Sequence, residues 1–260
     1  MRFPDFLKEG NILNYLDIHA HILPAVDDGA RDMETSLKLL HMLKEQGVTH
    51  VVATPHFYPD SDNIEQFAET VKTAFVELER EARKGDLPKI FFGCELRYFS
   101  GMGKSRAVKQ FAIQNTNYLL LELPYGEPVT KTVINDIIDI KEVLGLTPIL
   151  AHIERYSKVS GFKKLLKLIS DGTALAHINA GSVISKDGAK ICEKLIKGGY
   201  VSYLASDSHS LVNRPPYIKQ ALDTISSRLG RSAATRLMIK SNRLLEEIEG
   251  TYEEYQLKNQ

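Results

Sequence analysis

Two histidines separated by a single residue, His19 and His21, end a short apolar run in the stretch Leu-Asp-Ile-His-Ala-His. In a β-strand, residues two apart point to the same side, so both imidazoles can reach one ion. A turn that contains proline follows and brings Asp27 and Asp28 to the same region. Imidazoles beside carboxylates are typical ligands of zinc, manganese and iron. The stretch therefore indicates a metal site, although a His-x-His pair alone is weak evidence for one.

Later apolar runs of the chain also end in residues that could bind a metal ion or a charged group. These residues are His56, Glu95, Glu122, His152, Arg155, Asp207 and His209. Asp207 and His209 repeat the two-residue spacing of the first pair. Because strand ends of one kind gather at one rim in an α/β barrel, we expect these side chains to lie close together.

Each of these residues has a simpler explanation when it is taken alone. Glu122 could be an acidic residue in the first turn of a helix, Asp28 could stabilise an Asp-Gly turn, and His56 could be a loop histidine. These explanations would have to hold independently at nearly every strand end. Histidines and acids gathered at one rim would repel one another or change protonation unless cations bound among them. We therefore predict a site for several metal ions.

The remaining histidines are interpreted differently. His41 lies inside a helical pattern and His50 opens an apolar run, so both are expected to be structural or surface residues. The sixth apolar run breaks the pattern, because it offers only His177 or Asn179. For His177 we favour a core histidine over an imidazole that supports the site.

Apolar runs alternate regularly with amphipathic stretches along the chain. The predicted strands cover residues 16–19, 48–54, 89–94, 118–122, 147–151, 174–179 and 201–205. The predicted helices cover residues 33–46, 63–84, 103–112, 129–144, 160–170, 185–197, 216–229 and 231–248. This alternation is typical of parallel strands joined by right-handed crossovers. It predicts a single-domain α/β fold, a TIM-like barrel one strand short of eight, with an open sheet as the alternative.

Length and composition indicate the domain bounds, the kinds of partner and the cellular location. Residues 16–248 are assigned to the barrel, with an N-terminal segment at 1–15 and a C-terminal tail at 249–260. The 33 basic and 33 acidic residues balance, which argues against a nucleic-acid partner. No apolar run is long enough for a transmembrane helix, and the first residues lack the apolar core of a signal peptide. Two cysteines cannot form a disulfide framework, so we expect a cytoplasmic protein.

The motifs together resemble the polymerase-and-histidinol-phosphatase (PHP) superfamily. The resemblance rests on His-x-His, the Asp-Asp-Gly turn, Thr-Pro-His, Gly-x-Glu and Ser-Asp-x-His. Ala-His-Ile-Glu-Arg-Tyr and Asn-Arg-Pro-Pro-Tyr resemble, more closely, the manganese-dependent tyrosine-protein phosphatases of bacterial capsule and exopolysaccharide operons, the CpsB/CapC type. The similarity runs from about residue 16 to about residue 245. The stretch after Glu95 departs from the Tyr-rich pattern of that family, which leaves the substrate contacts of this loop open.

The resemblance implies a distorted (β/α)7 barrel that holds three divalent metal ions, with manganese expected and iron or zinc as alternatives. The first ion would take His19, His21, Glu95 and Asp207; the second would share Glu95 and add Glu122 and His152; the third would take Asp28, His56 and His209. Arg155 and Arg214 match the phosphate-binding arginines of the family. The implied activity is hydrolysis of phosphotyrosine on a bacterial tyrosine kinase tail or related protein, which regulates capsular or exopolysaccharide synthesis.

A metal-bound hydroxide would attack phosphorus, because cations lower the pKa of bound water from about 15.7 to about 7. Arg155 and Arg214 would bind the equatorial oxygens. Asp207 and His209 are candidates for a general acid, which a phenolate leaving group of pKa about 10 does not strictly need. The rival cysteine chemistry requires Cys-x5-Arg, which neither Cys94 nor Cys192 provides.

Other functions fit the sequence less well. A histidinol-phosphate phosphatase would use the same ions on a small alkyl phosphate and is the main alternative. A nuclease would need a basic stripe, and a non-catalytic kinase-binding partner would show a broken ligand set. The helix that begins near Thr35 resembles a segment used for self-association in relatives, although such helices often only cover the barrel. Tyr252 and Tyr255 lie among acids in the tail, where a solvated end is favoured over a substrate role.

Overall fold

The computed structural model describes residues 15–258, so the predicted N-terminal segment lies, apart from Tyr15, outside the described residues. Its strands are β1 (Tyr15–Ala20), β2 (Val48–Ala53), β3 (His56–Phe57), β4 (Lys89–Phe92), β5 (Glu95–Arg97), β6 (Tyr118–Glu122), β7 (Thr147–Leu150), β8 (Leu175–Asn179) and β9 (Tyr203–Ala205). Its helices are α1 (Met33–Glu45), α2 (Ile64–Lys84), η1 (Met102–Lys104), η2 (Arg106–Phe111), α3 (Lys131–Glu142), η3 (Ile153–Tyr156), α4 (Phe162–Ser170), α5 (Ala180–Ile184), α6 (Ala189–Lys197), α7 (Ile218–Leu229) and α8 (Arg231–Lys258). The η elements are 3-10 helices.

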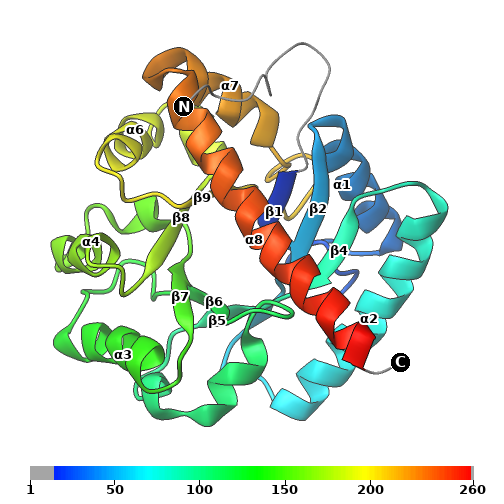
Figure 1. Ribbon diagram of the computed structural model, residues 1–260, viewed down its shortest axis with the longest axis horizontal. Helices are drawn as coiled ribbons and strands as arrows, with labels where there is room; N and C mark the ends of the chain where they lie inside the picture. The colour runs from blue at the N-terminus through cyan, green and yellow to red at the C-terminus, as the bar shows by residue number, and fades with distance from the viewer. Residues whose placement is uncertain (1–14, 259–260) are drawn as a thin grey trace.

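The strands pair in parallel around a ring, as predicted for an α/β barrel (Figure 1). One sheet has the order β1-β2-β4 and the other the order β3-β5-β6-β7-β8-β9. The last strand meets the first, because the N–H of Asp207 donates to the carbonyl of His19 and the N–H of His21 donates to that of Ser208, each at 2.9 Å. These bonds close the ring and confirm the predicted fold class.

The predicted strands 48–54 and 89–94 each end slightly early, as β2 and β4, and each is followed after a short irregularity by a further short strand, β3 and β5. Pro55 separates β2 from β3 and has no N–H to give to a neighbouring strand. Gly93 separates β4 from β5, and a Cβ at this position would lie 2.7 Å from Val52 Cγ1. Across the breaks, the Gly93 N–H still donates to Ala53 at 2.9 Å and the Glu95 N–H to Pro55 at 3.1 Å. The interrupted strands therefore stay side by side, and the barrel is distorted rather than open here.

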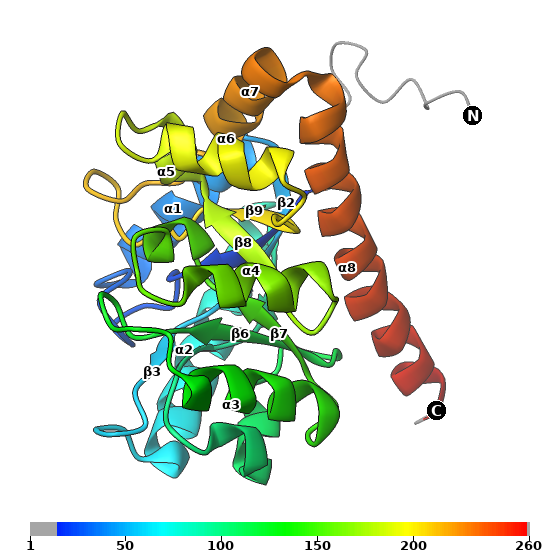
Figure 2. The same ribbon diagram turned by 90° about the vertical axis from the view of Figure 1, so that its left-hand side faces the viewer.

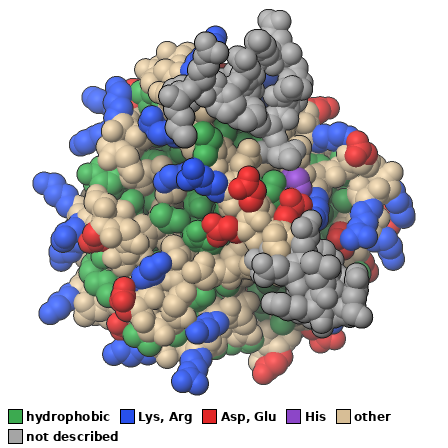
Figure 3. All heavy atoms as spheres, viewed as in Figure 1, with side chains coloured by type: hydrophobic (Ala, Val, Ile, Leu, Met, Phe, Trp, Pro, Cys, Tyr) green, Lys and Arg blue, Asp and Glu red, His purple; other side chains and the backbone are tan. Residues whose placement is uncertain are grey.

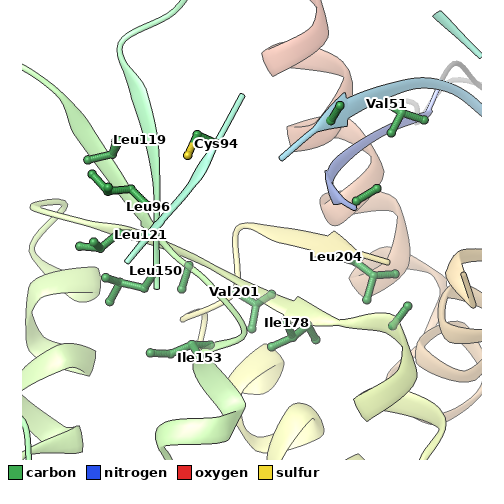
Figure 4. Close-up of a cluster of buried hydrophobic side chains, with 14 of the residues drawn as sticks. Val51, Cys94, Leu96, Leu119, Leu121, Leu150, Ile153, Ile178, Val201 and Leu204 are labelled. Atoms are coloured by element: carbon green, nitrogen blue, oxygen red, sulfur yellow. The ribbon is translucent and has the colours of Figure 1, made fainter. Parts of the chain in front are cut away.

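The outer helices cover the strands with a continuous apolar layer. Figure 4 shows Leu96, Leu119, Leu121 and Leu150, from the neighbouring strands β5, β6 and β7, side by side in this layer. All four side chains are fully buried. Burying a leucine side chain contributes about 1.5–3 kcal/mol, so this layer holds the strands and helices in register. The rigid strand ends that result can position polar side chains at the rim.

Helix α8 packs against the N-terminal ends of the strands (Figures 1 and 2). The Oγ of Ser241 accepts from the N–H of Leu16 at 3.0 Å and donates to its carbonyl at 2.7 Å. Leu244, Leu245 and Ile248 join a second apolar cluster, with Leu16 and other strand residues. Lys, Arg, Asp and Glu side chains are mixed over this face (Figure 3). Among the described residues, no helix is long and apolar enough to cross a bilayer.

Some helix bounds differ from the sequence-based prediction. The stretch predicted as a helix at 103–112 forms two 3-10 helices, and Gly103 packs so closely that a Cβ would lie 2.6 Å from the carbonyl of Asp136 in α3. The helix predicted at 185–197 begins only at Ala189, because Ser185 Oγ accepts from the Gly188 N–H at 2.9 Å in a turn. Helix α8 continues past residue 248 to Lys258, into the stretch assigned to the tail.

Candidate metal centre

Nine side chains predicted to bind metal ions gather where the strands end, opposite α8. Each has a nitrogen or oxygen within 3.6 Å of another member of the set. The set comprises His19, His21, Asp28, His56, Glu95, Glu122, His152, Asp207 and His209. The structure therefore brings together residues from the ends of six strands, β1, β3, β5, β6, β7 and β9, and from the loops that follow them.

Four ligand atoms form a compact group beside β1. The Nε2 atoms of His19 and His21 lie 3.0 Å apart. Oε2 of Glu95 is 3.1 and 3.4 Å from them, and Oδ1 of Asp207 is 3.5 and 3.6 Å from them. Four ligands placed about 2.1 Å from a central ion in a tetrahedron lie about 3.4 Å from one another. The two imidazoles and Asp207 thus form one candidate group for a divalent ion, and Glu95 approaches both imidazoles at distances that a shared ion could span.

The Glu95 carboxylate also faces a second group. Its other oxygen, Oε1, lies 3.0 Å from Nε2 of His152, and Oε1 of Glu122 lies 3.6 Å from the same nitrogen. Nδ1 of His56 lies 3.1 Å from Oε2 of Glu95. A carboxylate that offers one oxygen to each of two groups can bridge two cations. Arg97 approaches the outer oxygen of Glu122 at 3.4 Å.

A third group lies on the side of the Asp-Asp-Gly turn. Oδ1 of Asp28 is 3.4 Å from Nε2 of His56 and 3.4 Å from Nε2 of His209. Ligand atoms of His21 also fall within 4.8 Å of this group. Three groups have ligand atoms that all lie within 4.8 Å of one another: His19, His21 and Asp207; His56, Glu95 and Glu122; and His21, Asp28, His56 and His209. They overlap the sets implied by the family resemblance, but His56 stands in the place of His152 beside Glu95 and Glu122, and Glu95 is not in the group of His19, His21 and Asp207.

Several of the converging atoms are buried without a hydrogen-bond partner among the described residues. They include Oε2 of Glu95, Oδ1 of Asp207, Nδ1 of His56 and Nε2 of His209. Buried polar atoms are nearly always paired in folded proteins, so orphaned atoms that face one another need an explanation. Oxygens and nitrogens of this kind are satisfied together by divalent cations. The residues present thus fit a site for metal ions.

The electrostatic environment differs among the side chains of the cluster. Burial would lower the pKa of His21, but its contacts with Asp27 and Glu95 raise that pKa to about 10. Burial, followed by the repulsion from His21, lowers the pKa of His209 to about 3. Burial alone would raise the pKa of Asp207 and of Glu95, but the combined effects of His19, His152 and His21 outweigh it, and both pKa values lie well below the usual range. Neutral imidazoles and ionised carboxylates are the ligand forms, so His209, Asp207 and Glu95 are in the state that binds a metal ion, whereas an ion would have to displace the proton of His21.

The backbone is unusual at two of the candidate ligands and in the turn. His152 and Asp207 have φ angles of 34° and 50°, in the left-handed region that costs a non-glycine residue free energy. Such strain collects at functional sites because the surrounding structure must hold it. Gly29 is needed for a close approach, since a Cβ there would lie 2.3 Å from the carbonyl oxygen of His21. The turn that carries Asp28 is thereby packed directly on His21.

Two residues outside the predicted set orient the first histidines. Nδ1 of His21 lies 2.7 Å from Oδ2 of Asp27, and Nδ1 of His19 lies 2.8 Å from Nε2 of His177. A partner on Nδ1 fixes the ring and leaves Nε2 free for a metal ion. His177 is fully buried, as the favoured interpretation of a core histidine expects, and its contact with His19 also fits the alternative, an imidazole that supports the site. The sequence signal for this role is that His177 lies on the predicted strand 174–179, the one of the seven predicted strands for which no ligand was proposed.

The same strand, β8, also supports Asp207. Asn179 lies two residues after His177 and donates from Nδ2 to Oδ2 of Asp207 at 2.5 Å. Arg155 and Arg214 donate to the same oxygen from their Nη2 atoms, each at 2.8 Å. The two arginines predicted to bind phosphate thus converge at the edge of the cluster, on the carboxylate whose other oxygen faces the histidines.

A cavity opens beside the third group of ligand atoms. It has a volume of about 490 Å³ and is lined by Asp28, His56 and Tyr58 together with the first turns of α2. The Tyr58 ring stacks on His56 with centroids 5.1 Å apart, and the Arg97 guanidinium lies 5.7 Å from the Tyr58 ring. Small-molecule and side-chain sites are commonly of this size. The cavity gives a ligand access to the cluster.

Two other histidines and the two cysteines take no part in the cluster. His41 is exposed on α1, and His50 stacks on Phe91 at the opposite end of the barrel, with centroids 5.8 Å apart. Cys94 and Cys192 are both buried, and burial raises the pKa of each thiol far above its usual value. Neither cysteine is therefore suited to act as a thiolate nucleophile.

A barrel of parallel strands whose C-terminal rim carries three groups of imidazoles and carboxylates defines a class of metal-binding α/β barrel proteins. Within that class, the chain belongs to the family described as "Capsular polysaccharide synthesis, CpsB/CapC", which matches residues 15–246. This confirms the resemblance noted in the sequence.

Two relatives illustrate the similarity. The tyrosine-protein phosphatase CpsB of Streptococcus agalactiae serotype III (strain NEM316) is 30% identical over 235 residues, which cover 87% of this chain and 96% of that protein. The tyrosine-protein phosphatase YwqE of Bacillus subtilis (strain 168) is 28% identical over 220 residues, which cover 83% of this chain and 85% of the relative.

Solved structures give the same picture. A chain from the work titled "Crystal structures of YwqE from Bacillus subtilis and CpsB from Streptococcus pneumoniae, unique metal-dependent tyrosine phosphatases" superposes with a TM-score of 0.79 at 27% identity. The match covers 89% of this chain and 94% of that one. A histidinol phosphate phosphatase from Lactococcus lactis shares the fold at 13% identity, with a TM-score of 0.51 over 85% of this chain and 94% of the other.

Proposed function

We propose that the protein is a metal-dependent tyrosine-protein phosphatase that hydrolyses phosphotyrosine by a non-cysteine mechanism. The observation that carries the proposal is the group at His19 and His21. Their Nε2 atoms lie 3.0 Å apart, an oxygen of Glu95 and an oxygen of Asp207 each lie within 3.6 Å of both, and two arginines lie at the edge of the group. Membership of the CpsB/CapC family, and the names of its relatives, support the assignment to tyrosine phosphatases.

The nine clustered residues would hold the metal ions, with manganese as the proposed native ion. Bound divalent ions would offset the charge of the phosphoryl oxygens and make water acidic enough to deliver hydroxide near neutral pH. The chain's contribution is to fix the ligands before substrate arrives. Asp27 and His177 hold the rings of His21 and His19, and the strained backbone holds His152 and Asp207.

Arg155 and Arg214 would bind the phosphoryl group of the substrate. Their side chains are 33% and 39% exposed, and both end beside Asp207, where a phosphate would meet the cluster. The planar guanidinium group can donate two parallel hydrogen bonds to phosphate oxygens. The phosphotyrosine ring would enter through the cavity beside Asp28, His56 and Tyr58.

Neither Asp207 nor His209, the two candidates for a general acid, has a proton free to give to the leaving group. Nδ1 of His209 lies 3.0 Å from the carbonyl oxygen of Asp207, to which it can donate, so its Nε2 would be left for a metal ion. Oδ2 of Asp207 already accepts hydrogen bonds from Asn179 and both arginines. We infer that both residues act as ligands and that tyrosine leaves as a phenolate, whose pKa is about 10.

The physiological substrate in this proposal is a bacterial tyrosine kinase tail or related protein, and the process is capsular or exopolysaccharide synthesis. Self-association through α1 and a cytoplasmic location stay predictions. Leu39, Leu40 and Leu43 of α1 are buried within the chain, so the apolar face of this helix is already covered.

The proposal is tested by hydrolysis of a phosphotyrosine peptide with added manganese, with a chelator, and with the variants Asp207→Asn and Cys94→Ser. We expect activity with manganese, loss with the chelator, and a fall of at least about a hundredfold in Asp207→Asn, while Cys94→Ser stays close to the parent protein. Faster turnover of histidinol phosphate than of the peptide would assign the protein to the other phosphatase class. Activity that survives chelation but not Cys94→Ser would contradict the mechanism.

A further inference from the structure

One oxygen at the edge of the metal centre receives more hydrogen bonds than it has lone pairs. Oδ2 of Asp207 accepts from Asn179 at 2.5 Å, from Arg155 at 2.8 Å and from Arg214 at 2.8 Å. A carboxylate oxygen offers about two lone-pair directions. One or two of these donors can therefore leave without stranding a buried charge.

The three donors differ in how easily they can leave. Asn179 has a short side chain, ends β8 and is 5% exposed. Its backbone N–H donates to Oε1 of the buried Glu154 at 3.3 Å, which also fixes the position of the residue. Arg155 and Arg214 have long side chains that are a third or more exposed. Long side chains keep much rotamer freedom when they are partly exposed. The arginines are thus the mobile donors and Asn179 is the fixed one.

The orientation of the Asn179 amide follows from its neighbour. The reversed orientation would place its oxygen 2.5 Å from the ionised Oδ2 of Asp207, where two acceptors repel each other. The NH₂ group must therefore face the carboxylate, and Oδ1 of Asn179 is left buried without a partner among the described residues. An orphaned oxygen is tolerated here because the opposite end of the amide donates to a charged group, which is the stronger kind of bond.

We propose that Asn179 is a positioning residue that keeps Asp207 aimed at the metal site while Arg155 and Arg214 turn from Asp207 to the phosphoryl group of the substrate. This inference rests on the proposed function. In the free protein the arginines are held on Asp207, and a bound phosphate competes for them. Asn179 then remains as the donor that satisfies Oδ2, so Oδ1 stays directed at His19 and His21.

The proposal predicts that loss of the Asn179 side chain weakens the binding of phosphate and not the binding of manganese. In Asn179→Ala, the arginines still hold Asp207 in the absence of phosphate, so manganese affinity stays within about twofold to threefold of the parent protein. When phosphate draws the arginines away, Oδ2 loses all its donors. A hydrogen bond to a charged group is worth enough to shift an equilibrium about tenfold or more. Phosphate should therefore bind the manganese-loaded variant about tenfold more weakly.

The test is a calorimetric titration of manganese into the metal-free protein, and of inorganic phosphate into the manganese-loaded protein. A parent protein that binds no phosphate would contradict the proposed function itself. If the parent binds phosphate and Asn179→Ala binds it equally well, this inference is overturned while the proposed function stands. It is also overturned if manganese affinity falls as much as phosphate affinity, because Asn179 would then be a general support of the site.

A second experiment removes both arginine donors by mutation and then compares manganese binding with and without Asn179. In the double variant Arg155→Gln, Arg214→Gln, Asn179 is the remaining donor to Asp207. Adding Asn179→Ala in that background should now weaken manganese binding about tenfold without any phosphate. An effect no larger than in the parent background would contradict the proposal, because a purely structural asparagine would not depend on the arginines.

Two further variants guard against misfolding. Asn179→Asp keeps the size of the side chain and replaces the donor by a carboxylate, so it should weaken phosphate binding at least as much as Asn179→Ala. Asn117→Ala is the matched control, because Asn117 is exposed just before β6, at the opposite end of the barrel. This control should bind manganese and phosphate as the parent does, and equal losses in both variants would overturn the proposal.

Discussion

Nδ1 of His19 and Nε2 of His177 lie 2.8 Å apart, although the two residues are 158 positions apart in the chain. The N–H of His152 donates to the same Nε2 at 3.3 Å, so this nitrogen acts as an acceptor. Burial, together with the nearby His19, holds the pKa of His177 well below its usual value. A neutral His177 therefore accepts the Nδ1 proton of His19 and leaves Nε2 of His19 for a metal ion.

This relationship predicts the effect of His177→Phe. The ring keeps its place in the core but cannot accept the proton of His19, and the loss of such an orienting partner typically costs 10-fold to about 100-fold in metal affinity. We expect manganese affinity to fall by that factor in calorimetry. His50→Phe is the control, since His50 also stacks within the barrel but at the far end, against Phe91. Unchanged manganese affinity in His177→Phe would show that the contact has no role in the site.

A second prediction concerns the turn that carries Asp28. In Gly29→Ala the added methyl would lie 2.3 Å from the carbonyl oxygen and 2.5 Å from the Cβ of His21, both far inside van der Waals contact. The turn must shift, so we expect the metal-free protein to lose about 1–3 kcal/mol of unfolding free energy. Chemical denaturation measures this loss, and manganese titration should show weaker binding because Asp28 moves with the turn.

Gly181→Ala is the matched control for that measurement. A Cβ at Gly181 would meet nothing closer than a carbon of Tyr217 at 3.8 Å, which is ordinary contact. This variant should fold with unchanged or slightly higher stability. Equal stabilities for Gly29→Ala and the parent protein would refute the close packing of the turn on His21.

The barrel could be predicted from the sequence because its signals are local. Apolar runs such as Leu119–Leu121 alternate with amphipathic helices, and this pattern needs no knowledge of distant contacts. The interruptions at Pro55 and Gly93 could not be predicted, because an apolar run does not show where the hydrogen bonds between neighbouring strands are interrupted. The long α8 was also underestimated, since its polar last turns resemble a solvated tail.

The gathering of the candidate ligands could be predicted because each one ends a strand or follows soon after a strand end, and strand ends meet at one rim. Their supporting residues could not. Whether His177 contacts His19, or Asn179 contacts Asp207, depends on the register between strands that are far apart in the chain. Asp27 and Asp28 are neighbours with the same chemistry, and only the turn geometry directs Asp27 to Nδ1 of His21. The sequence thus predicts the first layer of the site and leaves the second to the structure.

The central claim is that these imidazoles and carboxylates hold several divalent cations in one cluster. Anomalous diffraction from crystals grown with manganese, recorded on both sides of the manganese absorption edge, measures this directly. The account predicts three peaks: one among His19, His21, Glu95 and Asp207, one beside Glu122 and His152, and one among Asp28, His56 and His209. Manganese-saturated crystals without a peak in this cluster would contradict it.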